Sequence, residues 1–310
     1  MMRHDKDVRR ENRWRQGGDG MGERWKEWMT SGLFCAVMSS LVFSVMNALV
    51  KAVSVHIPSN EIVFFRSAIG TVLILLLMRV QGMRASNAGI PLLVLRGSLG
   101  ALYMLAYFYT IAYMPLVDAI ILVNLSPVFS FILAAIFLKE KLPGRMGLIL
   151  PVIFAGAMLT INPLGYSTYS AVALFGIAAA VLSGAAGVCI RYLSRSFHAY
   201  EIILYFMAAA TLISIPLMWR DFVVPTPWEL FLLTAMGVVS LLAQVFLTKA
   251  FTHENVVIVE VVRYIGILFN AFWGFAIWAE IPTWNVVAGG ALIVSGCILL
   301  SHTAAKNRPN

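Results

Sequence analysis

The stretch PLVDAIILVNLSPVFSFILAAIFLKEKLP, residues 115–143, decides the fold. Its apolar part is about 24 residues long, enough for a helix across a hydrocarbon core of about 30 Å. Pro127 lies in the middle and cannot donate a backbone hydrogen bond, so it frees a carbonyl oxygen at Val123 or Asn124. Asn124, Pro127 and Ser130 recur on one side and form a polar seam. We therefore expect a membrane-spanning helix that is hinged at Pro127 and lines a cavity.

A second copy of this stretch, NVVIVEVVRYIGILFNAFWGFAIWAEIPT, follows 140 residues later at residues 255–283. Matches of charged residues and glycines carry the most information, because leucine and alanine often coincide in an apolar chain. These matches are Glu61 with Glu201, Glu140 with Glu280, Gly97 with Gly237, and Gly156 with Gly296. The sequence therefore predicts a duplication. The predicted parts are a tail (1–30), a first copy (31–161), a second copy (170–301) and a C-terminal tail (302–310).

The composition is that of an integral membrane protein. Of the 310 residues, 60% are hydrophobic and 12% are charged, and the mean hydropathy is +0.83. The net charge of +8 comes from Lys and Arg at the ends of apolar runs, so nucleic acid is not an expected partner. Three scattered cysteines indicate neither a disulfide framework nor a metal site.

Hydropathy divides the chain into ten apolar runs with short connections between them. The runs cover residues 31–53, 60–80, 90–112, 115–138, 144–161, 170–192, 200–219, 228–250, 254–279 and 281–301. The distribution of Lys and Arg places both termini in the cytoplasm. Five spans per copy is an odd number, so the second copy enters the membrane from the opposite side. The predicted fold is an all-α integral membrane protein with ten transmembrane helices, arranged as two inverted five-helix repeats.

Helical spacing brings polar residues to one face of several spans, most clearly in the third, where Arg96, Gly100, Tyr103 and Tyr107 share a stripe. We expect the first, third, fourth, eighth and ninth spans to wall a cavity, with the sixth as a further wall. The candidate substrate-binding residues are Asn47, Arg66, Arg96, Tyr103, Tyr107, Asn124, Gln244, Glu260, Arg263 and Tyr264.

The three intramembrane arginines among them require an explanation, because buried ionisable groups are costly in a bilayer. One interpretation is a cationic floor for a substrate carboxylate or phosphate, which the guanidinium fork binds bidentately. The alternative is internal pairing. The expected pairs are Arg263 with Glu260, and Arg66 with Glu61 or Asp118. The two tyrosines of the third span either stack on a cyclic substrate or pack within the bundle.

Residues 96–163 resemble the EamA-type domain of the drug/metabolite transporter superfamily. The resemblance rests on Arg96-Gly97 opening the third span, Ser126-Pro127 within the fourth, Lys-Glu-Lys at its end, and a glycine-rich fifth span. The second copy is similar but has Met236-Gly237 and Gly266-Ile267 at the first two motifs. The order of segments also resembles the solute-carrier branch related to nucleotide-sugar transporters.

This resemblance implies ten helices around a central cavity, alternating access, and export or exchange of amino acids, other metabolites, drugs or sugar nucleotides. With the three arginines, it predicts a secondary transporter of a small carboxylate-bearing or anionic metabolite in the plasma membrane, which is the inner membrane of a bacterium. The expected partners are a small-molecule substrate and the lipid bilayer. No cofactor or metal is expected, and the protein is expected as a monomer or homodimer.

Other functions stay open at this point. The runner-up is efflux of amphipathic drugs or cations, recognised by Glu260 and Asp118. A lipid-handling or scaffold role is a further alternative. An enzyme is not expected, because the five histidines lie in the tail, in loops or at span ends and none pairs with another at metal-ligand spacing. No phosphate-binding loop supports ATP coupling.

Overall fold

The computed structural model describes residues 31–83, 89–123, 125–138, 146–161, 170–219, 221–281, 283–285, 287–292, 295–296 and 299, and these residues contain helices and no strand. The first half contributes α2 (Gly32–Val53), α3 (Ser59–Val80), α4 (Ile90–Tyr113), α5 (Leu116–Val123), α6 (Ser126–Leu133), the π-helix η1 (Ala134–Leu138) and α7 (Met146–Ile161). The second half contributes α8 (Ser170–Leu193), α9 (Ala199–Met218), α10 (Pro227–His253), α11 (Val256–Val262) and α12 (Ile265–Trp278). The all-α prediction is confirmed.

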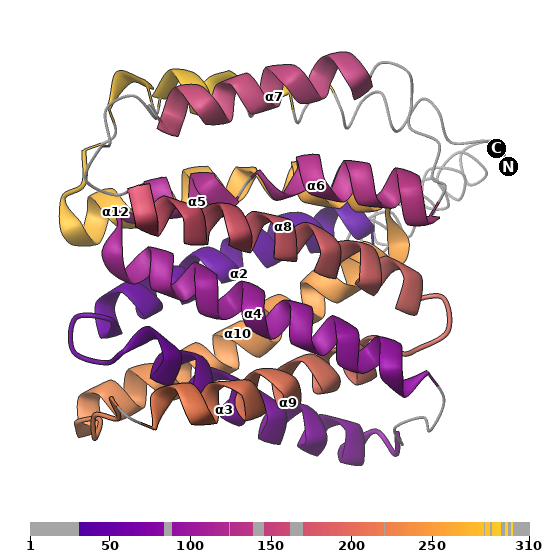
Figure 1. Cartoon of the computed structure of the whole chain (residues 1–310), viewed down its shortest axis with the longest axis vertical. Coiled ribbons are helices and arrows are strands. Elements are labelled where there is room, and N and C mark those ends of the chain that lie inside the picture. The colour runs from indigo at the N-terminus through magenta and orange to yellow at the C-terminus, as the bar shows by residue number, and fades with distance from the viewer. Residues whose placement is uncertain are drawn as a thin grey trace, which may run out of the picture.

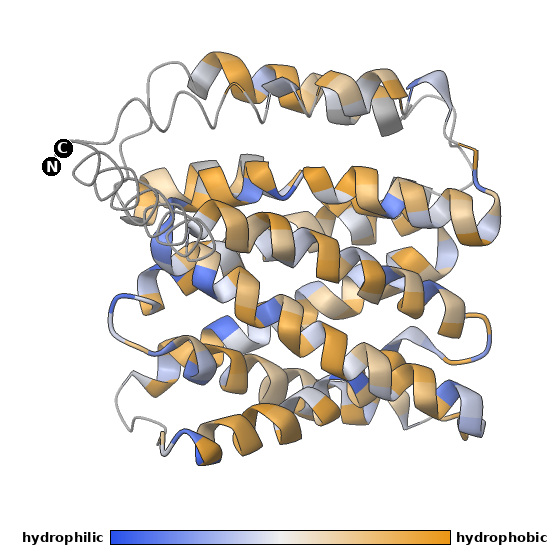
Figure 2. Cartoon of the chain, turned by 180° about the vertical axis from the view of Figure 1, so that it is seen from behind, coloured by the Kyte–Doolittle hydropathy of each residue, from blue (hydrophilic) through white to orange (hydrophobic). Residues whose placement is uncertain are grey.

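Seven helical segments in the described part of the chain are long and apolar enough to cross a membrane. They are Gly32–Val53, Ser59–Val80, Ile90–Tyr113, Val172–Leu193, Ala199–Met218, Pro227–His253 and Ile258–Trp278. Figure 2 shows that hydrophobic residues dominate these helices and that many hydrophilic residues lie at the turns. The predicted fourth span is interrupted, α7 is a 16-residue helix, and much of the predicted tenth span lies outside the described residues. The count of ten spans therefore stays a prediction.

The fourth span differs from the single helix predicted over residues 115–138. Helix α5 ends at Val123 and α6 begins at Ser126, and the span finishes as the π-helix η1. Pro127 is the second residue of α6, a position where a missing N–H breaks no intrahelical bond. The proline therefore starts a new helix instead of bending a continuous one.

The helices pack in pairs that have counterparts in the other half. Helix α2 packs on α10 and α8 packs on α4; likewise α4 packs on α9 and α10 packs on α3. In Figure 1, α3 and α9 lie side by side at one edge of the bundle, and α7 lies in a layer at the opposite edge. The turns after α2 and α8 also share their bonding: Ser54 N–H donates to Val50 O, and Ser194 N–H donates to Ile190 O.

Glycines permit two of these equivalent crossings. An added Cβ at Gly97 of α4 would lie 2.6 Å from the backbone oxygen of Tyr205 in α9. The matching glycine of the second half, Gly237 in α10, faces α3, and a Cβ there would lie 2.6 Å from Cγ2 of Ile69. The first obstacle is backbone, and the second is the branch point of Ile69, whose Cβ would lie 2.9 Å away and keeps its place when the side chain changes rotamer.

We predict that Gly97→Ala and Gly237→Ala each destabilise the protein by about 1–3 kcal/mol. Each added methyl group must separate two helices, α4 from α9 or α10 from α3, because neither obstacle moves with a rotamer change. The midpoints of thermal unfolding of the two variants and of the unsubstituted protein in the same detergent measure the loss. An unchanged midpoint in either variant would contradict the close helix crossing at that glycine.

Candidate functional site

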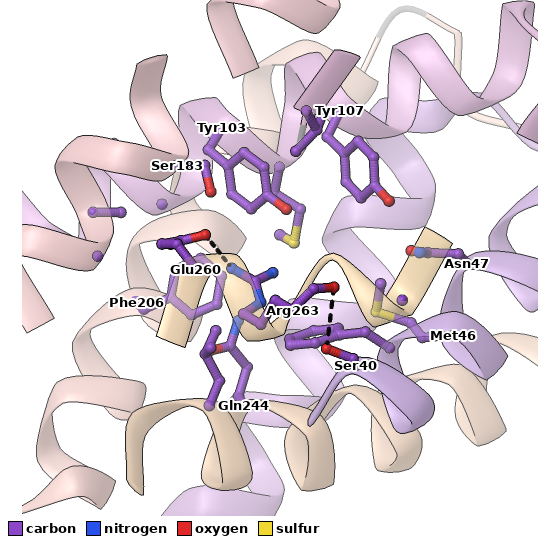
Figure 3. Close-up of a pocket in the computed structure, with 18 of the residues that line it drawn as sticks. Ser40, Met46, Asn47, Tyr103, Tyr107, Ser183, Phe206, Gln244, Glu260 and Arg263 are labelled. Carbon is purple, nitrogen blue, oxygen red and sulfur yellow. Dashed lines mark hydrogen bonds and ion pairs between the residues drawn. The ribbon is translucent and has the colours of Figure 1, made fainter. Parts of the chain in front are cut away.

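A cavity lies inside the bundle, with an empty volume of about 870 Å³ that includes the space at its opening. Its lining residues come from α2, α3, α4, α5, α8, α9, α10, α11 and α12 and from the junction between the last two helices. Figure 3 shows the polar residues of this lining facing one another. The predicted residues that line it are Asn47, Arg66, Arg96, Tyr103, Tyr107, Gln244, Glu260 and Arg263.

A break in the ninth span positions Arg263. Helix α11 ends at Val262 and α12 begins at Ile265, so Arg263 and Tyr264 form a tight turn between them. Within this turn the N–H of Gly266 donates to Arg263 O at 2.9 Å, and Ser40 Oγ of α2 donates to the same oxygen at 3.4 Å. The backbone oxygen that the break would leave unpaired is thereby satisfied from inside the protein. The Arg263 side chain points into the cavity (Figure 3).

Glu260 and Arg263 form an ion pair in the cavity wall. Nη1 of Arg263 lies 3.1 Å from Oε2 of Glu260, and Ser126 Oγ donates to the same oxygen at 3.1 Å. The Glu260 side chain is 2% exposed. The predicted pairing of these two residues is therefore present, and it compensates one buried carboxylate with one guanidinium.

Arg66 and Arg96 form the second charged feature of the cavity, and they have no such compensation. They are 1% and 3% exposed, and among the side chains that the structure describes no carboxylate forms an ion pair with either. Both guanidiniums instead lie over the ring of Phe206, at 5.7 Å and 4.7 Å from its centroid. An aromatic ring attracts a cation but accepts none of its hydrogen bonds in full. Nε of Arg66 and both Nε and Nη1 of Arg96 therefore have no hydrogen-bond partner among the described residues.

The predicted pair of Arg66 with Glu61 is wrong. The Glu61 carboxylate is buried near the start of α3, where Oε2 accepts from the N–H of Val223 at 3.0 Å. Glu61 therefore accepts a hydrogen bond from the segment that leads into α10, and does not pair with the guanidinium five residues further along α3. The side chain of Asp118, the other predicted partner, lies outside the described residues.

Gly100 makes room for the Arg96 guanidinium. An added Cβ at this position would lie 2.3 Å from Nη1 of Arg96 and 2.6 Å from Cδ2 of Phe206. Only a residue without a side chain lets the guanidinium fold back along α4 beneath the ring. The stripe Arg96–Gly100 seen in the sequence therefore has a specific packing reason.

The tyrosines of α4 stack on each other. The rings of Tyr103 and Tyr107 are 5.6 Å apart between centroids and 11° from parallel. Beside Tyr107, Asn47 Nδ2 of α2 donates to Oδ1 of Asn270 in α12 at 3.1 Å. Aromatic and amide groups therefore form the wall that faces the charged residues (Figure 3).

Three predicted residues are not among those that line the cavity. Tyr264 is buried in the adjacent apolar core, which also holds Ile267 and Val261. Asn124 lies outside the described residues. The backbone of Pro127 lies in the first turn of α6, and its side chain is outside the described set.

The sequence also missed part of the wall. Phe206 and Arg66 bring α9 and α3, the seventh and second spans, into the lining, although only Arg66 was a candidate. Phe206 gave no signal, because a phenylalanine in an apolar helix is ordinary. Asn270 could have been found from the sequence, because it lies 140 residues after Ser130 of the polar seam and so occupies the equivalent position in the second copy.

The arrangement favours binding over bond chemistry. Three guanidiniums face one carboxylate among the described lining residues, which gives the cavity an excess of positive charge. No group of three or more His, Cys, Asp or Glu residues in the described ranges could hold a metal ion. A cavity of this kind suits a small organic molecule with oxyanion groups.

Comparisons with known proteins agree with a transport function. The chain is 54% identical over 276 residues to the pseudopaline exporter CntI of Pseudomonas aeruginosa, covering 89% of this chain and 97% of the relative. It is 29% identical to mouse solute carrier family 35 member G1, with 89% and 78% covered. It is 22% identical to an S-adenosylmethionine uptake transporter of Rickettsia felis, with 92% and 97% covered.

Fold and family comparisons extend this agreement. A solved crystal structure matches the fold with a TM-score of 0.72 at 18% identity, covering 87% of this chain and 98% of the other. The model of the EamA-like transporter family matches the chain twice, at residues 30–162 and 170–302. The family consists of transporters and not of enzymes, as the sequence predicted. With its apolar helices, the chain is a multi-pass membrane transporter and belongs to the EamA-like transporter family.

Proposed function

We propose that the protein is a secondary transporter that exports pseudopaline or a related small metabolite with carboxylate or other anionic groups. The observation that carries this proposal is the pair of buried arginines: Nε of Arg66 and both Nε and Nη1 of Arg96 lack acceptors among the described residues, and Nη1 of Arg66 has only the sulfur of Met104. A substrate oxyanion would supply these acceptors and compensate the buried charge. The identity of 54% to a pseudopaline exporter supports the direction and the substrate.

Ten helices in two inverted repeats are part of this proposal. The paired packings α2–α10 with α8–α4, and α4–α9 with α10–α3, support it because each is obtained from the other by exchanging the halves. The fourth and ninth spans break within one residue of equivalent positions, at Val123–Ser126 and at Val262–Ile265. Exchange of two such conformations between the halves would open one mouth of the cavity and close the other.

Charge distribution supports an orientation with both termini in the cytoplasm of a plasma membrane. The cytoplasmic connections would hold Arg79, Arg84, Lys139, Lys141, Arg145, Arg191, Arg195, Lys249, Lys306 and Arg308. The outer connections would hold only Lys51 and Arg220. Positive charge concentrates on the cytoplasmic side of membrane proteins.

A row of polar contacts between α2 and the ninth span, called the α2 contact row, supports alternating access. The side-chain contacts along it are Ser44 with Trp273 at 3.1 Å, Asn47 with Asn270 at 3.1 Å, and the ion pair of Lys51 with Glu280. Lys51 also lies 5.0 Å from the ring centroid of Trp278. These contacts run from the cavity to the end of the bundle where α2 ends. They can separate and re-form, since Lys51 and Glu280 are partly exposed.

Efflux of amphipathic cations is the second candidate. The buried carboxylate of Glu260 and the aromatic rings of Phe43, Phe108 and Phe206 in the lining favour it. The excess of guanidiniums in the same cavity disfavours it, because a cation would be repelled.

We predict that Arg66→Ala and Arg96→Ala each lower pseudopaline export at least about tenfold, since each removes charge-assisted hydrogen bonds of about 1.5–3 kcal/mol. Arg195→Ala, at an exposed position in the turn after α8, is the matched control and should leave export unchanged. Transport into inside-out vesicles measures the effect. Near-normal transport by both cavity variants, with folded and monodisperse protein, would refute the anion site.

Reporter fusions test the orientation. A fluorescent protein that matures only in the cytoplasm should be active at both the N- and the C-terminus, and alkaline phosphatase should be inactive at both. Activity of alkaline phosphatase at one end alone would contradict an even number of spans.

Cross-linking tests whether the α2 contact row has to open during transport. In a chain without its native cysteines, a cleavable reagent that joins Lys51→Cys to Glu280→Cys should reduce transport to background, and reductant should restore it. Each single-cysteine variant treated with the same reagent is the control. Full transport with the cross-link in place would show that the α2 contact row does not open during transport.

A further inference from the structure

One oxygen of the buried Glu260 carboxylate accepts no hydrogen bond in the contacts described above. Oε2 accepts from both Arg263 and Ser126, whereas Oε1 has no hydrogen-bond partner among the described residues. The residue lines the cavity, and Figure 3 shows it beside Arg263 and below Tyr103. A buried carboxylate oxygen without a donor is costly, so its presence in a cavity wall points to a donor that arrives with a ligand.

The space next to Oε1 is kept free by a glycine. An added Cβ at Gly187 of α8 would lie 3.1 Å from Oε1 of Glu260 and 3.2 Å from Cζ of Phe251. Gly187 and Phe251 both line the cavity. A hydrogen-bond donor of a ligand can therefore approach Oε1 over a position that any other residue would partly fill.

Among the residues that the structure describes, the groups around Glu260 provide one cation and no second carboxylate. The charged and titratable side chains that face it are Arg263 and, from α4, the Tyr103 phenol. Helix α6 presents Ser126, α8 presents Gly187 and α10 presents Phe251. Arg263 is already engaged with Oε2, so no neighbouring cation among the described residues compensates Oε1.

The lining of the cavity therefore has two kinds of unpaired polar atoms. At Arg66 and Arg96 they are donors, whereas Oε1 of Glu260, Oδ1 of Asn47 and Oε1 of Gln244 are acceptors. An anion alone would satisfy the donors and leave the Glu260 oxygen without a donor. A molecule that carries both oxyanions and a protonated nitrogen would satisfy the guanidiniums and the carboxylate.

Resting on the proposed function, we infer that the substrate donates a hydrogen bond from a protonated nitrogen to Oε1 of Glu260, and that this site exchanges the substrate for a proton. The carboxylate accepts this bond only when deprotonated. When Glu260 holds a proton, substrate binding breaks its O–H bond and the proton passes to the solvent. On the outer side, a proton that binds Glu260 displaces the substrate nitrogen, so an exporter with this site works as an antiporter.

Calorimetry of pseudopaline binding to the purified full-length protein tests the inference. Titrations in phosphate and in Tris, which differ in ionisation enthalpy, give the number of protons exchanged. Wild-type protein should release protons on binding in the pH range where Glu260 titrates, and its affinity should fall as the pH falls through that range. Glu260→Gln should bind at least about tenfold more weakly, without proton release and without this pH dependence.

A second variant leaves the carboxylate intact. Gly187→Ala narrows the approach to Oε1 and should weaken binding while the Glu260–Arg263 pair remains. Glu61→Gln is the matched control, because Glu61 is a buried carboxylate outside the cavity lining, and it should bind with unchanged affinity and unchanged proton release.

The outcomes separate this inference from the proposed function. Pseudopaline that binds wild-type protein with no proton release, or with proton uptake, would overturn the role of Glu260 and leave the anion site standing. Absence of pseudopaline binding to folded wild-type protein would overturn the proposed function and this inference with it. Unchanged binding and proton release in Glu260→Gln would assign the released proton to another group and also overturn the inference.

Discussion

The ion pair between Glu260 and Arg263 is the interaction on which the cavity depends. Charged groups within a membrane must face protein or a wet space, and this pair satisfies the requirement at a break in the helix. The break turns the Arg263 side chain inward and exposes a backbone oxygen, which Ser40 and Gly266 satisfy. Removal of either partner of a buried pair leaves an uncompensated charge, so the two residues and the break between their helices form one unit.

Small residues allow the charged ones to exist at this depth. Gly100 gives the Arg96 guanidinium a place beneath Phe206, and Gly187 keeps the approach to Glu260 open. Gly97 and Gly237 bring the helices close enough for residues of both halves to share the cavity. Glycine at these four positions therefore provides the space for the charged side chains in an otherwise tightly packed bundle.

Much of the fold could be predicted from the sequence, because a bilayer admits few structures. Apolar runs of 20 or more residues must be helices, and the 140-residue offset correctly paired Gly97 with Gly237. Spacing also placed Arg96, Tyr103 and Tyr107 on one face of α4 that lines the cavity. Spacing did not predict features that depend on neighbouring helices. Pro127 starts a new helix, Glu61 bonds to Val223 and not to Arg66, and both guanidiniums lie over the ring of Phe206.

The position of Phe206 has a consequence for biosynthesis. Arg66 and Arg96 are made in the first half of the chain, whereas the ring that covers both belongs to α9 of the second half. During synthesis both guanidiniums therefore enter the membrane before Phe206 is made, although Arg66 also lies 5.7 Å from the ring centroid of Phe108 in the first half. The ring that the two guanidiniums share is thus supplied only with α9, so the first half by itself lacks this part of the cavity wall.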